Sequence, residues 1–316
     1  MNKASDSRTS PFALNFGAAL DDGTLFVCGV SLELEDRDVL HTIIWERYAE
    51  TWQRYQWKNR TDGIAAHFVD GGATAVYMGF EGSLKVRSKL LGSSEERVEI
   101  KGDGPSTLRP LSTIRIIGDH LYVAGMRRMV YRRPLVGGAW ARFDDGLRLK
   151  KGDLTIAGLN AIDGYDQQDL YAAGMNGEVW RYTASGWRRV DAPTNLDLFA
   201  VCCFDDRYVV VAGEKGALLV GKDDQWTALS HSFKDEVFTC IERWNRRCFV
   251  CSDAGSLYEL ILGASATLVP MILEQTPSVA WIAASASRVY FVGTRSIVSL
   301  GDDGLRDESP PTALMF

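Results

Sequence analysis

One pattern of apolar and polar positions recurs along the chain. Two apolar residues three positions apart are followed by a polar turn and then by an apolar run that ends in glycine or serine. The clearest copies are LSTIRIIGDHLYVAG (111–125), LNAIDGYDQQDLYAAG (159–174), LFAVCCFDDRYVVVAG (198–213), FTCIERWNRRCFVCS (238–252) and VAWIAASASRVYFVG (279–293). AAHFVDGGATAVYMG (65–79) and ALNFGAALDDGTLFVCG (13–29) are weaker copies. Each copy predicts two short β-strands joined by a turn.

The copies return at a regular interval. Their closing residues are Gly29, Gly79, Gly125, Gly174, Gly213, Ser252 and Gly293, so the intervals are 50, 46, 49, 39, 39 and 41 residues and average 44. A period near this length with four short strands per unit is typical of a β-propeller blade. Closing seven such units into a ring buries the blade faces that an open stack would expose. We therefore predict an all-β fold, a single seven-bladed β-propeller domain over residues 1–316.

The repeat also decides how an ambiguous aromatic segment, WERYAETWQRYQW (45–57), folds. Its aromatic residues recur at intervals of three and four, as on one helix face, but most of its residues are also good strand formers. Trp187 lies 13 residues after Gly174, and Trp52 lies 23 residues after Gly29, which is 13 plus a ten-residue insertion. The segment therefore aligns with the third and fourth strands of a unit, and we predict a β-hairpin.

The start of the chain suggests how the ring closes. SDSRTSPFALNF (5–16) is similar to passages that lead from a fourth strand into a first strand, such as DAPTNLDLFAV (191–201). We therefore expect residues 1–10 to contribute a strand that seals the last blade.

The segments DLYAAGMNGEVWRYTASGWRRV (169–190) and VVVAGEKGALLVGKDDQWTAL (209–229) resemble the bacterial propeller superfamily with WD-repeat-like, YVTN-type and BNR-like repeats. The resemblance covers essentially the whole chain and implies a fold, but no catalytic residues, because propellers host many unrelated functions. The Gly-His and Trp-Asp dipeptides of WD repeats are absent. More loosely, an acidic propeller with diverged blades is similar to some bacterial immunity proteins encoded beside secreted toxins.

Composition and charge narrow the classes of function. Hydrophobic residues make up 46% of the chain and charged residues 24%, as in a soluble globular protein. A net charge of −6 opposes binding to nucleic acid or anionic membranes and favours a basic protein partner. No apolar run approaches the roughly 20 residues that cross a bilayer, and the first residues lack a secretory signal. We expect a cytoplasmic protein that is a monomer by itself.

Candidate chemical motifs are weak. GALLVGKD (216–223) matches most of a phosphate-binding loop, but it lacks the following Ser or Thr and the repeat places it on a strand. The histidines fall in different units without the spacing of metal ligands, and His67 is interpreted as a core or channel residue. Cysteines 202 and 203, like cysteines 248 and 251, would point to opposite faces of a strand. We predict no catalytic residues, no metal site and no cofactor.

Most tryptophans recur at equivalent or near-equivalent positions, which predicts that they pack in the core; these are Trp45, Trp52, Trp140, Trp180, Trp187 and Trp226. Trp57 has no counterpart, since the matching position in the fourth unit is Ala192, and we interpret it as a surface anchor for a partner. Trp244, in the turn ERWNRR, is a second exposed candidate. The arginine pairs 127–128, 132–133, 188–189 and 246–247 are interpreted as solvated strand faces or turns.

Extra residues are concentrated in the first three units. Ten of them (31–40) separate a second strand from a third, while KGDGPSTLRP (101–110) and LKKGDLTIAG (149–158) join a fourth strand to the next first strand. In a four-stranded meander these two kinds of loop emerge on the same face. Loops on a rigid scaffold commonly carry binding residues, although neutral drift in loop length would give the same distribution.

These observations favour a non-enzymatic protein-binding propeller. The leading hypothesis is a cytoplasmic inhibitor or immunity protein that neutralises a basic protein partner, such as a secreted bacterial toxin. The partner-binding residues expected from the insertions and from the unmatched tryptophan are Glu33, Glu35, Asp36, Asp38, Trp57, Lys101, Asp103 and Arg109. The alternative is a carbohydrate-binding or glycan-processing propeller that acts at the mouth of the central channel.

Overall fold

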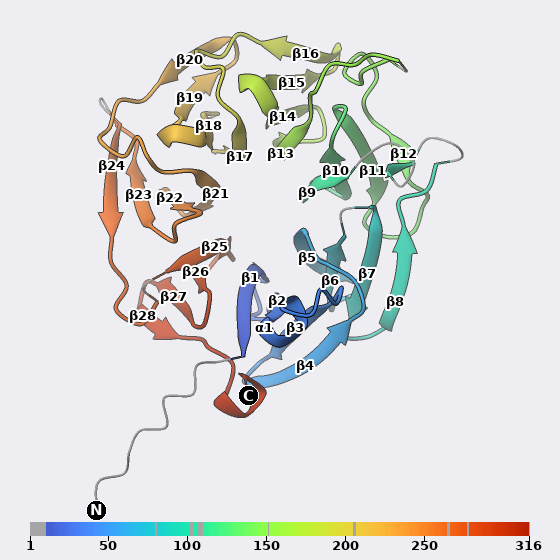
Figure 1. Ribbon diagram of the computed structural model, residues 1–316, viewed down its shortest axis with the longest axis vertical. Helices are drawn as coiled ribbons and strands as arrows, with labels where there is room; N and C mark the ends of the chain where they lie inside the picture. Colours follow the sequence, from blue (N-terminus) through green and yellow to red (C-terminus); the bar gives the residue numbers. More distant parts are fainter. Residues whose placement is uncertain are drawn as a thin grey trace, which may run out of the picture.

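The computed structural model describes residues 11–79, 81–100, 104–105, 110–150, 152–204, 207–263, 266–276 and 278–315. These residues form seven four-stranded antiparallel sheets arranged as a ring, with the first strand of each sheet innermost (Figure 1). Each sheet is built from four consecutive strands of the chain. The predicted all-β, seven-bladed propeller is confirmed.

The blades are numbered in chain order. Blade 1 contains β1 (Phe12–Ala19), β2 (Leu25–Ser31), β3 (Thr42–Tyr48) and β4 (Thr51–Trp57). Blade 2 contains β5 (Gly63–Val69), β6 (Gly72–Met78), β7 (Ser83–Ser88) and β8 (Gly92–Arg97), and blade 3 contains β9 (Leu111–Ile117), β10 (His120–Gly125), β11 (Met129–Pro134) and β12 (Ala141–Arg142). Blade 4 contains β13 (Leu159–Asp166), β14 (Asp169–Gly174), β15 (Val179–Thr183) and β16 (Gly186–Val190). Blade 5 contains β17 (Leu198–Cys203), β18 (Val209–Gly213), β19 (Leu218–Lys222) and β20 (Gln225–Ala228). Blade 6 contains β21 (Phe238–Trp244), β22 (Arg247–Ser252), β23 (Leu257–Ile261) and β24 (Thr267–Met271), and blade 7 contains β25 (Val279–Ala284), β26 (Arg288–Gly293), β27 (Ile297–Gly301) and β28 (Gly304–Asp307).

The ambiguous aromatic segment is a hairpin, as predicted. β3 and β4 pair in antiparallel register from Thr42 opposite Trp57 to Tyr48 opposite Thr51. Trp45, in the middle of β3, is fully buried. The aromatic spacing therefore reflects two strands folded back on each other rather than one face of a helix.

A β-bulge explains why the repeated pattern ends in glycine. In blade 4 the register of β13 against β14 shifts between Leu159 and Ala161. This shift brings the carbonyl oxygen of Gly158 so close to Gly174 that a Cβ there would lie 1.9 Å from it. Three further closing glycines are in the same situation. An added Cβ would lie 2.0 Å from a main-chain oxygen at Gly29, 2.3 Å at Gly125 and 2.0 Å at Gly213. Only glycine fits where one backbone approaches another this closely.

The apolar core lies between the blades. It consists of seven clusters, each joining residues of two neighbouring blades. Cys202 and Cys203 belong to different clusters, and so do Cys248 and Cys251, because alternate residues of a strand face opposite sides. All six cysteines are buried and free. The predicted alternation of the cysteine pairs is confirmed.

Ion pairs link the edges of neighbouring blades. Arg87 of blade 2 donates to Glu46 of blade 1 from Nε at 2.5 Å and from Nη2 at 3.0 Å, and Glu46 is fully buried. Arg128 of blade 3 bonds Glu178 of blade 4, and Arg133 of blade 3 bonds Glu96 of blade 2. The side chains of Arg128 and Arg133 expose only 14% and 9% of their surface. Their interpretation as solvated residues was wrong, because each partner lies on another blade.

The C-terminal segment closes the ring in the described part of the chain. Residues beyond β28 cross from blade 7 to blade 1 and end in α3 (Thr312–Met315), which lies beside β4 (Figure 1). Trp45 Nε1 donates to the carbonyl oxygen of Leu314 at 3.1 Å, and Met315 is buried against blade 1. Arg47 forms a further ion pair with Glu308. Residues 1–10, expected to seal the last blade, lie outside the described residues.

Candidate functional site: the loop face and the central channel

Residues 31–40, called the acidic insertion below, form an exposed projection on blade 1. They join β2 to β3 and contain the single-turn helix α1 (Leu32–Glu35). The four predicted carboxylates, Glu33, Glu35, Asp36 and Asp38, are all exposed. Apart from Arg37, which lies 3.6 Å from Glu33, the insertion has no cation. The face of the ring that carries this insertion and the connections from each fourth strand to the next blade is called the loop face.

His41 fixes the base of the acidic insertion. Its Nε2 accepts a hydrogen bond from the main-chain N–H of Ser31 at 2.8 Å, and its Nδ1 donates to the carbonyl oxygen of Val39 at 2.6 Å. One nitrogen must accept and the other must donate, so this arrangement requires a neutral imidazole. His41 is 2% exposed. The carboxylates therefore sit on a loop whose two ends are tied together.

Exposed aliphatic side chains accompany the carboxylates. Leu40 is 62% exposed, and Leu32 and Val39 are close to 40% exposed. Contiguous exposed apolar surface beside polar residues is a feature of protein-binding sites. The acidic insertion thus exposes aliphatic side chains beside its four carboxylates.

The connection between blades 3 and 4 is held rigidly on the same face. Arg127 donates from Nη1 to the carbonyl oxygen of Asp153 at 3.0 Å and from Nη2 to that of Lys150 at 2.7 Å. The backbone of Arg127 has a φ of 61°, a left-handed conformation that is uncommon for a residue with a side chain. This connection presents Leu154, 92% exposed, and Ile156, 70% exposed, to solvent.

Two of the expected surface residues are buried. Trp57 is 5% exposed and packs with Ile44 of its own blade and Tyr77 of blade 2, so its interpretation as a surface anchor was wrong. Trp244 is also 5% exposed, because it is the last residue of β21 and faces the cluster between blades 6 and 7. Neighbouring blades cover both side chains, which a single unit of the repeat cannot reveal.

The remaining expected residues lie beyond what the structure describes. Lys101, Asp103 and Arg109 fall among residues 101–103 and 106–109, outside the described ranges. The connection that contains them joins β8 to β9, as predicted. The tryptophans expected to pack do so: Trp45 is fully buried, and Trp52, Trp140, Trp180, Trp187 and Trp226 are half-buried against core clusters.

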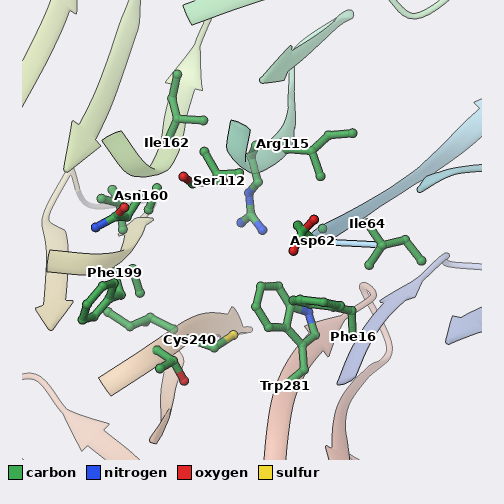
Figure 2. A pocket seen from close by; sticks show the side chains of 18 of the residues that line it. Phe16, Asp62, Ile64, Ser112, Arg115, Asn160, Ile162, Phe199, Cys240 and Trp281 are labelled. Carbon is green, nitrogen blue, oxygen red and sulfur yellow. The ribbon is translucent and has the colours of Figure 1, made fainter. Parts of the chain in front are cut away.

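The central channel opens toward the loop face as a cavity of about 320 Å³, called the upper chamber (Figure 2). The first strands of the blades, or the residues just before them, line it with aromatic and polar side chains from different blades. Phe16 and Trp281 form one wall, with ring centroids 5.0 Å apart and planes at 72°. The other labelled aromatic and polar residues around it include Asp62, Ser112, Asn160 and Phe199.

Arg115 crosses the channel below the upper chamber. Its Nε donates to Asp163 of blade 4 at 3.1 Å, and its Nη1 donates to Glu242 of blade 6 at 2.9 Å. The two carboxylates hold the pKa of the Arg115 guanidinium well above its ordinary value. Asp163 also accepts from the main-chain N–H of Cys203 in blade 5. Three side chains thus connect blades 3 to 6 across the ring, and the guanidinium is matched by two negative charges.

A second cavity connects the upper chamber to the acidic insertion. This side cavity, about 310 Å³, shares Phe16, Asp62 and Trp281 with the upper chamber and reaches Glu35. Arg60, at its rim, lies 3.1 Å from Asp62 with a side chain that is 67% exposed. A larger cavity of about 720 Å³ lies on the opposite side of Arg115 and opens at the other mouth.

The channel residues were missed by the sequence analysis, although a signal exists. Asp62 immediately precedes β5, and Ser112, Asn160 and Phe199 are the second residues of β9, β13 and β17. They occupy near-equivalent positions of the repeat but differ in type from blade to blade. Such variation marks a position whose residue type the repeat does not fix, but it does not separate channel residues from buried ones, since Trp57 also varies and is buried.

The structure places two of the motifs that were weighed as chemical candidates, one on a strand and one in a groove between blades. Among the described residues, no group of three or more His, Cys, Asp and Glu side chains is placed to hold a metal ion. Residues 218–222 of the phosphate-loop-like segment form β19, as predicted. His67 lies near Arg133 in a groove between blades 2 and 3, and not in the channel. Burial of its imidazole lowers the pKa of His67. In the part of the chain that is described, no helix is long and apolar enough to cross a membrane.

The fold places the chain in the class of seven-bladed β-propellers, and solved structures agree. It is similar to the WD40 propeller domain of Doa1, with a TM-score of 0.64 and 10% identity, covering 95% of this chain and 93% of that one. It is also similar to virginiamycin B lyase from Staphylococcus aureus, with a TM-score of 0.63, 10% identity and 96% coverage of both chains. At these identities the likeness shows the fold alone.

A more specific similarity comes from a curated protein. The chain is 28% identical over 248 residues to the immune protein Tsi7 of Pseudomonas aeruginosa, which covers 75% of this chain and 78% of that protein. No family model matches the chain.

Proposed function

We propose that this chain is a non-enzymatic immunity protein that binds and neutralises a protein toxin. The observation that carries the proposal is the similarity to the immune protein Tsi7 over three quarters of the chain. The propeller supports it, because its rigid blades present long loops on one face. We propose further that the protein acts in the cytoplasm as a monomer, binds its toxin directly and needs no cofactor.

The acidic insertion is the proposed contact with a basic toxin surface. Its four carboxylates are exposed on a loop tied down by His41, so little ordering is needed when a partner binds. Opposite charges across an interface accelerate association and disfavour wrong partners. The aliphatic side chains of Leu32, Val39 and Leu40 supply apolar contact beside the charges.

Reversing the charge of the acidic insertion tests this placement. In a variant with Glu33→Lys, Glu35→Lys, Asp36→Lys and Asp38→Lys, we expect association with the toxin to slow about ten- to a thousandfold at low salt, because electrostatic steering is lost. The probe is an inactivated variant of the toxin, sought first among the products of the open reading frames adjacent to the gene, and association is measured by surface plasmon resonance.

A matched control carries the same change of charge on the opposite face. Glu50, Asp70 and Asp302, in turns, and Asp166, the last residue of β13, are exposed away from the loop face, and changing all four to Lys should leave association within about threefold of the wild type. If the two variants associate at the same rate, the acidic insertion is not the contact.

The upper chamber also fits a second function. Aromatic walls next to hydroxyl, amide and carboxylate groups are suited to sugars, and such groups line this cavity. A glycan array and a hydrolysis screen test it: saturable binding of a sugar, with no toxin captured by the same protein, would favour a carbohydrate-binding propeller.

A further inference from the structure

The charges around the upper chamber select for a cation. Within the part of the chain that the structure describes, the upper chamber and the side cavity are lined by three carboxylates and two guanidinium groups, namely Glu35, Asp62 and Glu242, and Arg60 and Arg115. Arg115 is already paired with Glu242 and with Asp163, so it has no uncompensated charge to offer an anion. The channel mouth is therefore net negative and matches a positively charged group.

The wall opposite the carboxylates favours the same kind of group. Phe16 and Trp281 are both half-buried and line the upper chamber and the side cavity. An aromatic face attracts a guanidinium or an ammonium group, and the attraction grows when the pair is shielded from water. The aliphatic stem of a lysine or arginine can also cover the apolar parts of such a wall.

The ion pair between Arg60 and Asp62 does not block entry. Because the Arg60 side chain is 67% exposed, the pair contributes little to stability and can be exchanged for a better shielded one. The chamber, at about 320 Å³, lies at the small end of ligand cavities, so it suits one side chain rather than a folded element.

We propose that the upper chamber receives one basic side chain, an arginine or a lysine, projecting from the bound toxin. Asp62 is its counter-ion, and Phe16 and Trp281 are its aromatic wall. The acidic insertion lies next to this entry, since Glu35 lines the side cavity that opens into the chamber. This inference rests on the proposed function, because the inserted side chain belongs to the toxin.

Two variants of the chamber test the inference against the inactivated toxin by isothermal titration calorimetry. Asp62→Asn removes the charge with little change of shape, and Trp281→Leu removes the aromatic face. We expect Asp62→Asn to weaken binding at least about thirtyfold, as when one partner of a shielded charge pair is lost, and Trp281→Leu to weaken it about five- to thirtyfold, as when a shielded cation–π contact is lost. Glu274→Gln, exposed on the loop face outside the cavities, and Ser112→Ala, inside the chamber, should remain within about threefold of the wild type.

A matching substitution in the toxin sharpens the result. The arginines and lysines of the toxin are changed to Ala one at a time, and each variant is titrated with the wild-type propeller and with its Asp62→Asn variant. One of these toxin variants should bind the wild-type propeller more weakly but lose no further affinity for Asp62→Asn, while the other toxin variants weaken binding to both equally. Unchanged affinity of both chamber variants, with melting temperatures close to that of the wild type, would overturn the inference even if the wild type binds the toxin tightly.

A titration of the protein without the toxin distinguishes failure of the chamber inference from failure of the proposed immunity function. L-arginine amide, followed by NMR through the indole N–H of Trp281, should bind at millimolar concentration in the wild type and not in Asp62→Asn. If the wild type does not bind the toxin, the proposed function fails and this titration still decides whether the chamber takes a cation. Binding of monosaccharides in place of L-arginine amide would overturn the inference.

Discussion

Glu178 shows how a single residue connects two blades through its charge. It is 4% exposed and accepts hydrogen bonds from Arg128 Nε at 2.6 Å, Arg128 Nη2 at 2.5 Å and Trp180 Nε1 at 3.0 Å. Burial raises the pKa of the carboxyl, but the bonds from Arg128 and Trp180 outweigh it, so the pKa lies below its ordinary value. The ionised form is the one that the folded ring stabilises.

This shift makes the contribution of Glu178 depend on pH. A carboxyl whose pKa is lower in the folded than in the unfolded protein adds stability that is present above its unfolded pKa, near 4.3, and is lost as the pH falls through the folded pKa. We expect Glu178→Gln to lower the free energy of unfolding by about 3 kcal/mol at pH 7, since Arg128 loses its buried partner. Urea denaturation at pH 7, 5, 4 and 3 should show this difference shrinking below pH 4.

Asp224→Asn is the control for that measurement. Asp224 pairs with Arg188, but its side chain is 67% exposed, so removing its charge should change the free energy of unfolding by less than about 1 kcal/mol. A difference between Glu178→Gln and the wild type that stays constant from pH 7 to pH 3 would contradict the assignment. Such pairs could not be predicted from the sequence, because Arg128 and Glu178 are 50 positions apart and neither lies in a repeated pattern.

For the secondary-structure elements, the sequence predicts the features that recur in every repeat and does not predict the contacts between repeats. The strand pairs follow from the repeated apolar pattern, and the hairpin over residues 45–57 follows from its alignment with the repeat. The closing glycines are visible in the sequence, but the bulge in the first strand that requires them is seen only in the structure. The burial of Trp57 did not follow, because it depends on the packing of blade 2 against blade 1. The lining of the channel depends on seven strands meeting at one axis, which no single unit contains.

Gly174 provides a test of the bulge as a structural element. A Cβ at this position would meet the carbonyl oxygen of Gly158 at 1.9 Å, so Gly174→Ala must displace β13 from β14. We expect a loss of about 3 kcal/mol or more in the free energy of unfolding. At Gly186 no atom lies within 4 Å of an added Cβ and only the φ of 97° is unfavourable, so Gly186→Ala should cost about 1 kcal/mol. Equal melting temperatures for the two variants would contradict this explanation.

The whole ring depends on the contact between its two ends. Blade 7 has four strands of its own, so the described closure does not exchange a strand between the first and last blades. Instead, the segment after β28 lies on blade 1, where Leu314 accepts from Trp45 and Arg54 and Met315 packs among buried residues. Closure by a C-terminal clasp was not predicted, because the segment PPTALM matches no part of the repeat.

Removing this segment should loosen the ring at one interface. Deletion of residues 311–316 leaves the Arg47–Glu308 pair but removes the contact with Trp45 and the buried Met315, so we expect the free energy of unfolding to fall by about 3–5 kcal/mol. Opening at this interface should also increase amide hydrogen exchange in β1 and β3 more than in β13 and β14, on the far side of the ring (Figure 1). Deletion of residues 1–10 is the comparison. If that deletion costs more stability than removal of residues 311–316, the first ten residues, and not the C-terminal segment, are the main seal of the propeller.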